Sequence, residues 1–276
     1  MPILITAEEL KSLIESPETV RVLDVRWRLG GPEGYPEYRA GHIPTAVYVD
    51  LETELARHGE PHEGRHPLPD AADLQAAARR WGLNDGETVV VYDDLKNLSA
   101  ARAWWLLTNA GVADVRLLDG SLRAWKEAGY DVAAGEAEGE PGTVTLAYSA
   151  EISLSIEEAA AFPETGVLLD ARAPERFRGD EEPIDPVAGH IPGARNAPAT
   201  ANFDSSGRFL SAEQLRAQFE AIGVSEDRPV AVYCGSGVSA AADAVALTIA
   251  GFDPALYAGS WSAWSNSPGR PVATGD

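Results

Sequence analysis

Hydrophobic and polar positions follow two patterns along the chain, and each pattern predicts one kind of element. Short, continuously apolar runs at 89–92 and 230–233 are typical of buried parallel strands. Amphipathic stretches at 70–81 and 211–222 have the apolar spacing of helices. Because strands and helices alternate, we expect an α/β fold in which helices cover both faces of mostly parallel sheets. Helix starts are predicted from the capping pairs Thr6 and Glu9, Ser155 and Glu158, and Ser211 and Gln214.

The chain repeats its own plan once. Four short motifs occur twice, at separations of 139 to 148 residues, which indicates a tandem domain duplication. A glycine-rich acidic stretch starting at Gly135 predicts a linker. We therefore expect one domain at 1–134, a linker at 135–150 and a second domain at 151–276. The repeated pairs are Arg21-Val-Leu-Asp-Val-Arg with Val167-Leu-Leu-Asp-Ala-Arg, Gly41-His-Ile-Pro with Gly189-His-Ile-Pro, Thr88-Val-Val-Val-Tyr-Asp with Pro229-Val-Ala-Val-Tyr-Cys, and Gly120-Ser-Leu-Arg-Ala-Trp with Gly259-Ser-Trp-Ser-Ala-Trp.

Composition narrows the functional classes. Hydrophobic residues make up 45% of the chain and charged residues 24%, as in core-forming globular proteins. The formal net charge of −21 argues against binding to nucleic acid or anionic membranes, because both need basic side chains. One cysteine forms no internal disulfide, and neither a signal peptide nor a membrane span is recognisable. We expect a soluble cytoplasmic protein that needs no cofactor or metal.

The single cysteine, Cys234, stands between an apolar strand and a helix. This position puts its side chain at the carboxyl edge of a parallel sheet, where α/β folds bind ligands. Gly235 and Gly237 allow the backbone to curl around the sulfur, and the following helix N-terminus favours a thiolate. A buried structural cysteine is the alternative. The placement favours a reactive nucleophile, so we predict sulfur chemistry at Cys234.

Asp93 stands in the first copy where the second copy has Cys234. A carboxylate cannot carry sulfur, so we expect the first copy to be catalytically silent. Asp93 or Asp94 would instead accept amide hydrogen bonds at the start of the helix predicted at 98–110. An aspartyl-phosphate nucleophile is a weaker alternative, because no supporting motif surrounds these residues.

Together these motifs resemble those of the tandem rhodanese-fold sulfurtransferases, and the resemblance covers essentially the whole chain. The loop Cys234-Gly-Ser-Gly-Val-Ser is similar to the Cys-Gly-Ser-Gly-Val-Thr loop of 3-mercaptopyruvate sulfurtransferases. It differs from the Cys-Arg-Lys-Gly-Val-Thr loop of thiosulfate sulfurtransferases, whose basic residues suit a dianion. The resemblance implies a Cys234 persulfide that takes sulfur from 3-mercaptopyruvate and passes it to cyanide or a thiol, such as a thioredoxin-like protein.

The resemblance also implies which residues bind the donor. Arg176 matches the arginine that holds the substrate carboxylate, and Arg178 is a second candidate. A surface ion pair with Glu175 or Asp180 is the alternative for Arg176. Some mercaptopyruvate enzymes have another arginine further along this loop, whereas residues 181–187 are only acidic or apolar here. Arg26 or Arg28 of the first copy are the candidate substitutes. Amides of the loop residues Gly235, Gly237, Val238 and Ser239 would hold the persulfide.

Ser236 is implied to assist proton transfer to the pyruvate enolate, with His42 as its partner. A purely structural role is the alternative for both, because Gly-His-Ile-Pro recurs with His190 in the second copy. The acid that would orient His42 is Glu33 or Glu37.

A second group of histidines, His58, His62 and His66, follows an interval of four that suggests a metal site. Glycines and prolines between them prevent a helix, so we interpret the stretch as a solvated loop. Rival functions are thiosulfate:cyanide sulfur transfer and a non-catalytic persulfide carrier. A cysteine phosphatase is disfavoured because Ala240 stands where phosphatases need an arginine.

Overall fold

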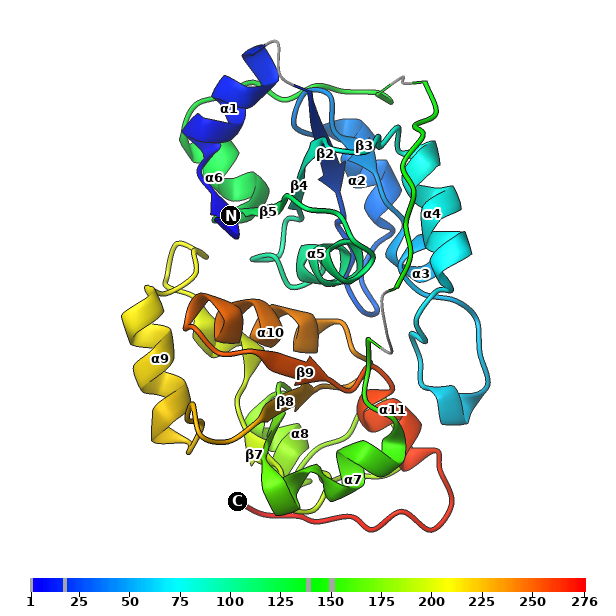
Figure 1. The fold of residues 1–276 in the computed structure, drawn as a ribbon, viewed down its shortest axis with the longest axis vertical. Helices are drawn as coiled ribbons and strands as arrows, with labels where there is room; N and C mark the ends of the chain where they lie inside the picture. Colours follow the sequence, from blue (N-terminus) through cyan, green and yellow to red (C-terminus); the bar gives the residue numbers. More distant parts are fainter. Residues whose placement is uncertain (1, 17–18, 138–139, 149–151) are drawn as a thin grey trace. The chain divides into compact units, whose positions relative to one another are not determined.

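The computed structural model forms two compact units, drawn in Figure 1. Unit 1 is formed mainly by the first copy of the repeat and unit 2 mainly by the second. Two short segments are exceptions, because residues 57–68 belong to unit 2 and residues 205–208 to unit 1. The domain limits expected from the sequence do not contain this exchange. The structure describes residues 2–16, 19–137, 140–148 and 152–276.

Unit 1 is built on a five-stranded parallel sheet with the order β1-β5-β4-β2-β3. Val90 and Tyr92 of the central strand join a core beneath α1 and α6, which lie together in Figure 1. Val89 and Val91 are buried on the opposite face, and α5 packs against β4 and β5. The elements are β1 (Leu4–Ile5), α1 (Ala7–Glu15), β2 (Val20–Asp24), α2 (Gly34–Ala40), β3 (Val47–Tyr48), α3 (Leu51–Glu54), α4 (Ala71–Arg80), β4 (Thr88–Tyr92), α5 (Ala100–Asn109), β5 (Val115–Leu118) and α6 (Ser121–Glu127).

Unit 2 repeats this plan with a four-stranded parallel sheet of order β7-β6-β8-β9. Tyr233 at the end of β8 joins a core with Trp261 and Trp264 of α11. On the other face, α10 packs against β8 and β9. The α/β prediction is therefore confirmed. The elements are η1 (Pro61–Glu63), α7 (Ile156–Thr165), β6 (Val167–Asp170), α8 (Pro174–Arg178), β7 (Arg195–Asn196), η2 (Ala199–Asn202), α9 (Ala212–Ala221), β8 (Val230–Tyr233), α10 (Ser239–Ile249), β9 (Pro254–Leu256) and α11 (Ser260–Ser265).

Helix starts follow the sequence closely. Thr6, Ser155 and Ser211 each cap a helix with a complete capping box, as predicted. None of the described helices has the length and apolar character that a membrane span requires.

The 57–68 segment reaches unit 2 through close backbone packing against α11. Gly64 has φ 94°, and a Cβ atom at this position would lie only 2.7 Å from the carbonyl oxygen of Gly259. The next amide, of Arg65, donates to the Ser262 hydroxyl at 3.0 Å. This packing fixes Arg65 and His66 in unit 2, beside the loop that carries the cysteine.

Candidate active site

Strand β8 delivers Cys234 to the carboxyl edge of its sheet, as the sequence predicts. The loop after it is held by α11, because the amides of Trp261 and Ser262 donate to the carbonyl oxygens of Cys234 and Gly235 at 2.9 and 2.8 Å. Within the loop, the Gly237 amide donates to the sulfur of Cys234 at 3.1 Å. Gly237 has φ 77°, a left-handed conformation that glycine adopts without strain. The cysteine residue is buried, with 1% of its surface exposed. An amide that points at the sulfur stabilises negative charge on it.

Ser236 contacts an imidazole. Its Oγ lies 2.8 Å from Nδ1 of His66, and both side chains are buried. The hydrogen bond can hold a proton on either partner, depending on the tautomer of the ring. His66 comes from the histidine stretch interpreted as a solvated loop. That interpretation is wrong for His66, because the 57–68 segment packs into unit 2. His58 and His62 are exposed. Among the described residues, no group of three or more potential ligands could hold a metal ion.

Two guanidinium groups converge on Gly235. A Cβ atom built on Gly235 would lie 3.3 Å from Nη1 of Arg176 and 3.4 Å from Nη2 of Arg65. Arg176, the predicted carboxylate anchor, extends from α8, and Arg65 from the 57–68 segment. Arg178 instead forms an exposed ion pair with Asp180 at 2.8 Å. The site therefore brings two arginines beside the nucleophile, of which the sequence analysis identified only Arg176.

Both arginines are already engaged by carboxylates. Arg176 donates to Glu182 at 2.7 and 3.2 Å and to Asp185 at 3.0 Å. Arg65 donates to the other oxygen of Asp185 at 2.8 Å. Burial raises the pKa of Glu182, but hydrogen bonds from Arg176 and from two backbone amides outweigh burial and lower it overall. Glu182 is therefore ionised at neutral pH, and Glu182 and Asp185 are the residues of the 181–187 stretch that pair with arginines.

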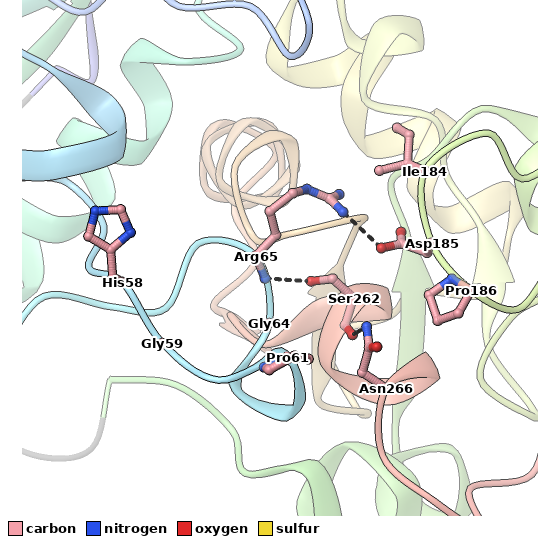
Figure 2. Close-up of a pocket in the computed structure, with 10 residues that line it drawn as sticks. All are labelled: His58, Gly59, Pro61, Gly64, Arg65, Ile184, Asp185, Pro186, Ser262 and Asn266. Atoms are coloured by element: carbon pink, nitrogen blue, oxygen red, sulfur yellow. Dashed lines mark hydrogen bonds and ion pairs between the residues drawn. The ribbon is translucent and has the colours of Figure 1, made fainter.

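A cavity of about 490 Å³ lies beside this ion-pair cluster (Figure 2). Figure 2 shows the Arg65 side chain crossing toward Asp185, with Ser262 of α11 and Asn266, the residue after this helix, below it. The cavity is large enough for a small organic anion. Ser262, which lines this cavity, donates its amide to the carbonyl oxygen of Gly235 in the cysteine loop.

Two parts of the chain match the same protein-family model. The Rhodanese-like domain matches twice, at residues 6–128 and 155–267. The chain belongs to the rhodanese family. It is 48% identical to the "Putative thiosulfate sulfurtransferase SseB" of Mycobacterium tuberculosis over 99% of this chain and 97% of that one. It is 49% identical to the "Probable 3-mercaptopyruvate sulfurtransferase" of Pseudomonas aeruginosa over 99% and 98%.

The solved structures agree with this family. The crystal structure of SseA from Escherichia coli, described as a 3-mercaptopyruvate sulfotransferase with the rhodanese fold, superimposes with a TM-score of 0.83. It is 33% identical and covers 95% of this chain and 99% of its own. The predicted family and fold are confirmed, and the chain is a sulfurtransferase of the rhodanese family.

The two rhodanese domains use their Gly-His-Ile-Pro motifs in the same way. His42 Nδ1 lies 3.0 Å from the carbonyl oxygen of Tyr38, and His190 Nδ1 lies 2.8 Å from that of Phe177. Each ring also stacks on the aromatic side chain of that residue. The backbone of each histidine pairs with a later strand-like residue of its own unit. His42 therefore makes the same contacts in its unit as His190 does in the other, and the imidazole that contacts Ser236 in the structure belongs to His66.

Arg26 of the first rhodanese domain is also structural. It is buried and donates to Asp24 at 2.9 Å and to the carbonyl oxygen of Gly41. Arg172 makes the matching contacts with Asp170 and Gly189 in the second domain. Arg28 forms an ion pair with Asp94. The second arginine beside Gly235 is thus Arg65, whereas the candidates Arg26 and Arg28 have partners in unit 1.

Asp93 shows what the equivalent loop of the first rhodanese domain does with an anion. Its carboxylate accepts four backbone amides, at 2.7 to 3.1 Å, and the hydroxyl of Ser121 at 3.0 Å. The predicted hydrogen-bonding role at the start of the following helix is confirmed for Asp93. The donating amides belong to Leu95, Asn97, Ser99 and Ala100.

Sequence reasoning missed Arg65, His66, Glu182 and Asp185 as members of the site. The pair Arg65 and Asp185 is separated by 120 residues, and the pair His66 and Ser236 by 170. No local periodicity connects positions so far apart. The one available signal is the concentration of histidines at 58–66, and its local pattern suggests only a metal site or a solvated loop.

Proposed function

We propose that this rhodanese moves sulfur from 3-mercaptopyruvate to a thiol or cyanide through a persulfide on Cys234. The observation that carries the proposal is the convergence on one loop of the thiol, the Ser236–His66 pair and the two arginines. The neutral side chains of Gly235 and Ser236 suit a donor with one carboxylate and a ketone. Relatives at 49% and 33% identity that carry the 3-mercaptopyruvate name support the same donor.

In the first half-reaction, the Cys234 thiolate attacks the sulfur atom of the donor. A sulfur–sulfur bond forms, the carbon–sulfur bond breaks, and its electron pair leaves with the pyruvate enolate. The enolate then takes a proton to become pyruvate. The Ser236 hydroxyl and His66 imidazole, 2.8 Å apart, form a relay that supplies this proton. Arg176 and Arg65 orient the donor carboxylate.

In the second half-reaction, an acceptor thiolate or cyanide attacks the outer sulfur of the persulfide and restores the Cys234 thiolate. The Gly237 amide, which donates to the cysteine sulfur, stabilises the Cys234 thiolate that attacks in the first half-reaction and leaves in the second. With one cysteine in 276 residues, the chain cannot release sulfur by forming an internal disulfide, so an external acceptor is required. We place the reaction in the cytoplasm, where such thiols stay reduced.

Thiosulfate is the second candidate donor. The relative from Mycobacterium tuberculosis, 48% identical, is named a putative thiosulfate sulfurtransferase. Two arginines beside the cysteine loop also provide more hydrogen-bond donors for an anion than the loop sequence alone suggests. The persulfide would be the same, with sulfite as the leaving group.

The test is steady-state sulfur transfer to cyanide with each donor on one preparation. We expect a higher kcat/KM with 3-mercaptopyruvate, and no turnover by Cys234→Ser with either donor. After donor treatment, intact mass of the wild-type chain should rise by about 32 Da, one sulfur atom, and that of the variant should not. Turnover by Cys234→Ser would contradict the mechanism. Persulfide formation without turnover would indicate a sulfur carrier.

A further inference from the structure

One buried carboxylate bridges the two arginines of the site. Asp185 accepts Arg65 Nη1 on one oxygen at 2.8 Å and Arg176 Nη2 on the other at 3.0 Å. Its side chain is only 2% exposed. The backbone amide of Asp185 donates to the Glu182 carboxylate at 3.1 Å. This hydrogen bond holds Asp185 and Glu182 in place relative to each other. Asp185 thus holds two like-charged groups close together that would otherwise repel each other.

The acidic side chains also cancel the positive charge of the cluster. Glu182 accepts from Arg176 at 2.7 Å and from Arg172 at 3.2 Å, and Arg172 pairs with Asp170 at 2.6 Å. Three arginines therefore face three carboxylates, all within one connected set of ion pairs. The proposed binding site for the sulfur donor therefore offers N–H groups for hydrogen bonds, while the ion-pair cluster as a whole has almost no net charge.

Guanidinium N–H groups of both arginines nevertheless point toward the loop that carries Cys234. Nη1 of Arg176 and Nη2 of Arg65 lie within 3.3 and 3.4 Å of one point beside Gly235. In the part of the chain that the structure describes, Nη2 and Nε of Arg65 are buried and lack a hydrogen-bond partner. Buried donors are normally satisfied, so these nitrogens point to a ligand with acceptor oxygens.

We propose that Asp185 is a specificity-determining residue that favours a monoanionic sulfur donor over a dianionic one. The inference rests on the proposed function and names the charge of the substrate. A single carboxylate can bond to the free nitrogens of both arginines without an excess of negative charge. A dianion would bring a second charge close to Asp185 and Glu182, and no further cation of the cluster compensates it. Repulsion of the wrong ligand is an established route to specificity.

The test removes the negative charge of Asp185 and keeps the shape of its side chain. Asp185→Asn should raise kcat/KM for thiosulfate relative to 3-mercaptopyruvate about tenfold, because the cluster gains one positive charge. Asp180→Asn is the matched control, since it makes the same charge change in the same loop at the exposed pair with Arg178. We expect that control to leave the donor ratio within about twofold of wild type. Melting temperatures establish that both variants fold.

A binding readout separates this inference from the proposed function. In the Cys234→Ser background, calorimetry with sulfate and with pyruvate measures the affinity for a dianion and a monoanion. Asp185→Asn should tighten sulfate binding about tenfold and pyruvate binding much less. Equal donor ratios and equal anion affinities for Asp185→Asn and Asp180→Asn would overturn the inference. If the wild type turns over neither donor while Asp185→Asn still tightens sulfate, only the proposed function fails.

Discussion

His66 and His42 share a residue type but have different surroundings, and this difference can be measured. His66 contacts the Ser236 hydroxyl, whereas His42 bonds to the backbone of its own unit. We expect His66→Gln and Ser236→Ala to lower kcat with 3-mercaptopyruvate about 10²-fold, as loss of a proton relay does. We expect His42→Gln to lower the melting temperature and to have a much smaller effect on kcat than His66→Gln. An equal loss of kcat in folded His42→Gln would contradict this assignment.

Cys234 could be predicted from the sequence because its role depends on local structure. A strand, a glycine-rich loop and a helix follow one another in the chain, and together they position the thiol. Arg65 and Asp185 could not be predicted, because their meeting depends on how two loops fold against α11. The sequence shows that the acidic stretch after α8 contains no arginine at residues 181–187. Its role as a bridge between cations becomes visible only in three dimensions.

Asp243 gives a prediction about pH. This residue of α10 is fully buried, and burial raises its pKa well above the usual range. A hydrogen bond from Asn202 at 2.6 Å opposes the shift, and the charge of Asp170 adds to it. The folded state therefore holds this proton more tightly than the unfolded state, so the stabilising contribution is present in acid and falls as the pH rises above about 4.

The variant Asp243→Asn mimics the protonated form at every pH. We expect its free energy of unfolding to exceed that of the wild type at pH 8, and the difference to shrink toward zero near pH 4. Urea denaturation at several pH values between 4 and 8 measures this difference. A difference that stays constant over this range would show that Asp243 has the same pKa in both states.

At the scale of elements, the β4–α5 loop of unit 1 and the β8–α10 loop of unit 2 differ in the side chain that fills them. The first is filled by the Asp93 carboxylate, which satisfies four amides and one hydroxyl. Asp93→Ala should cost about 3 kcal/mol of unfolding free energy, because it leaves several buried donors without an acceptor. Asp94→Ala is the control, with an expected cost of about 1 kcal/mol or less, since its partner Arg28 is 40% exposed. Denaturant melts measure both, and similar costs would contradict the filled-loop interpretation.

Long elements were predictable and short ones were not. The strands β4 and β8 appear as uninterrupted apolar runs, and the capping boxes mark the starts of α1, α7 and α9. In contrast, η1 spans three residues, which is too short for any periodicity. The glycines and prolines of the 57–68 segment favour a solvated loop in isolation. Packing against α11 overrides that local preference and brings His66 into unit 2.

At the scale of the whole molecule, the segment 57–68 makes unit 2 depend on chain from the first copy. A protease site inserted between residues 138 and 139 tests this dependence. We expect the two fragments to elute together after cleavage and to keep most of the turnover, because Arg65 and His66 remain packed beside Gly235 and Ser236. A chain of residues 151–276 made alone should lose about 10²-fold in kcat, since it lacks this segment.

Uncleaved protein with the same insertion is the control for effects of the insertion itself. Full activity of the 151–276 chain would contradict the assignment of His66 and Arg65 to the site. Fragments that separate on a sizing column would show that the contacts of the segment are too weak to hold it without a covalent connection.

The exchanged segment also has a consequence for the history of the gene. A duplicated copy that has lost its nucleophile is normally free to decay or to be deleted. Here the copy with Asp93 encodes two residues that lie beside the cysteine loop of the other copy, so its deletion would remove Arg65 and His66 together. Selection on sulfur transfer therefore acts on both halves of the reading frame. A recombination event at the junction would produce two incomplete genes, and the pair can only be inherited together.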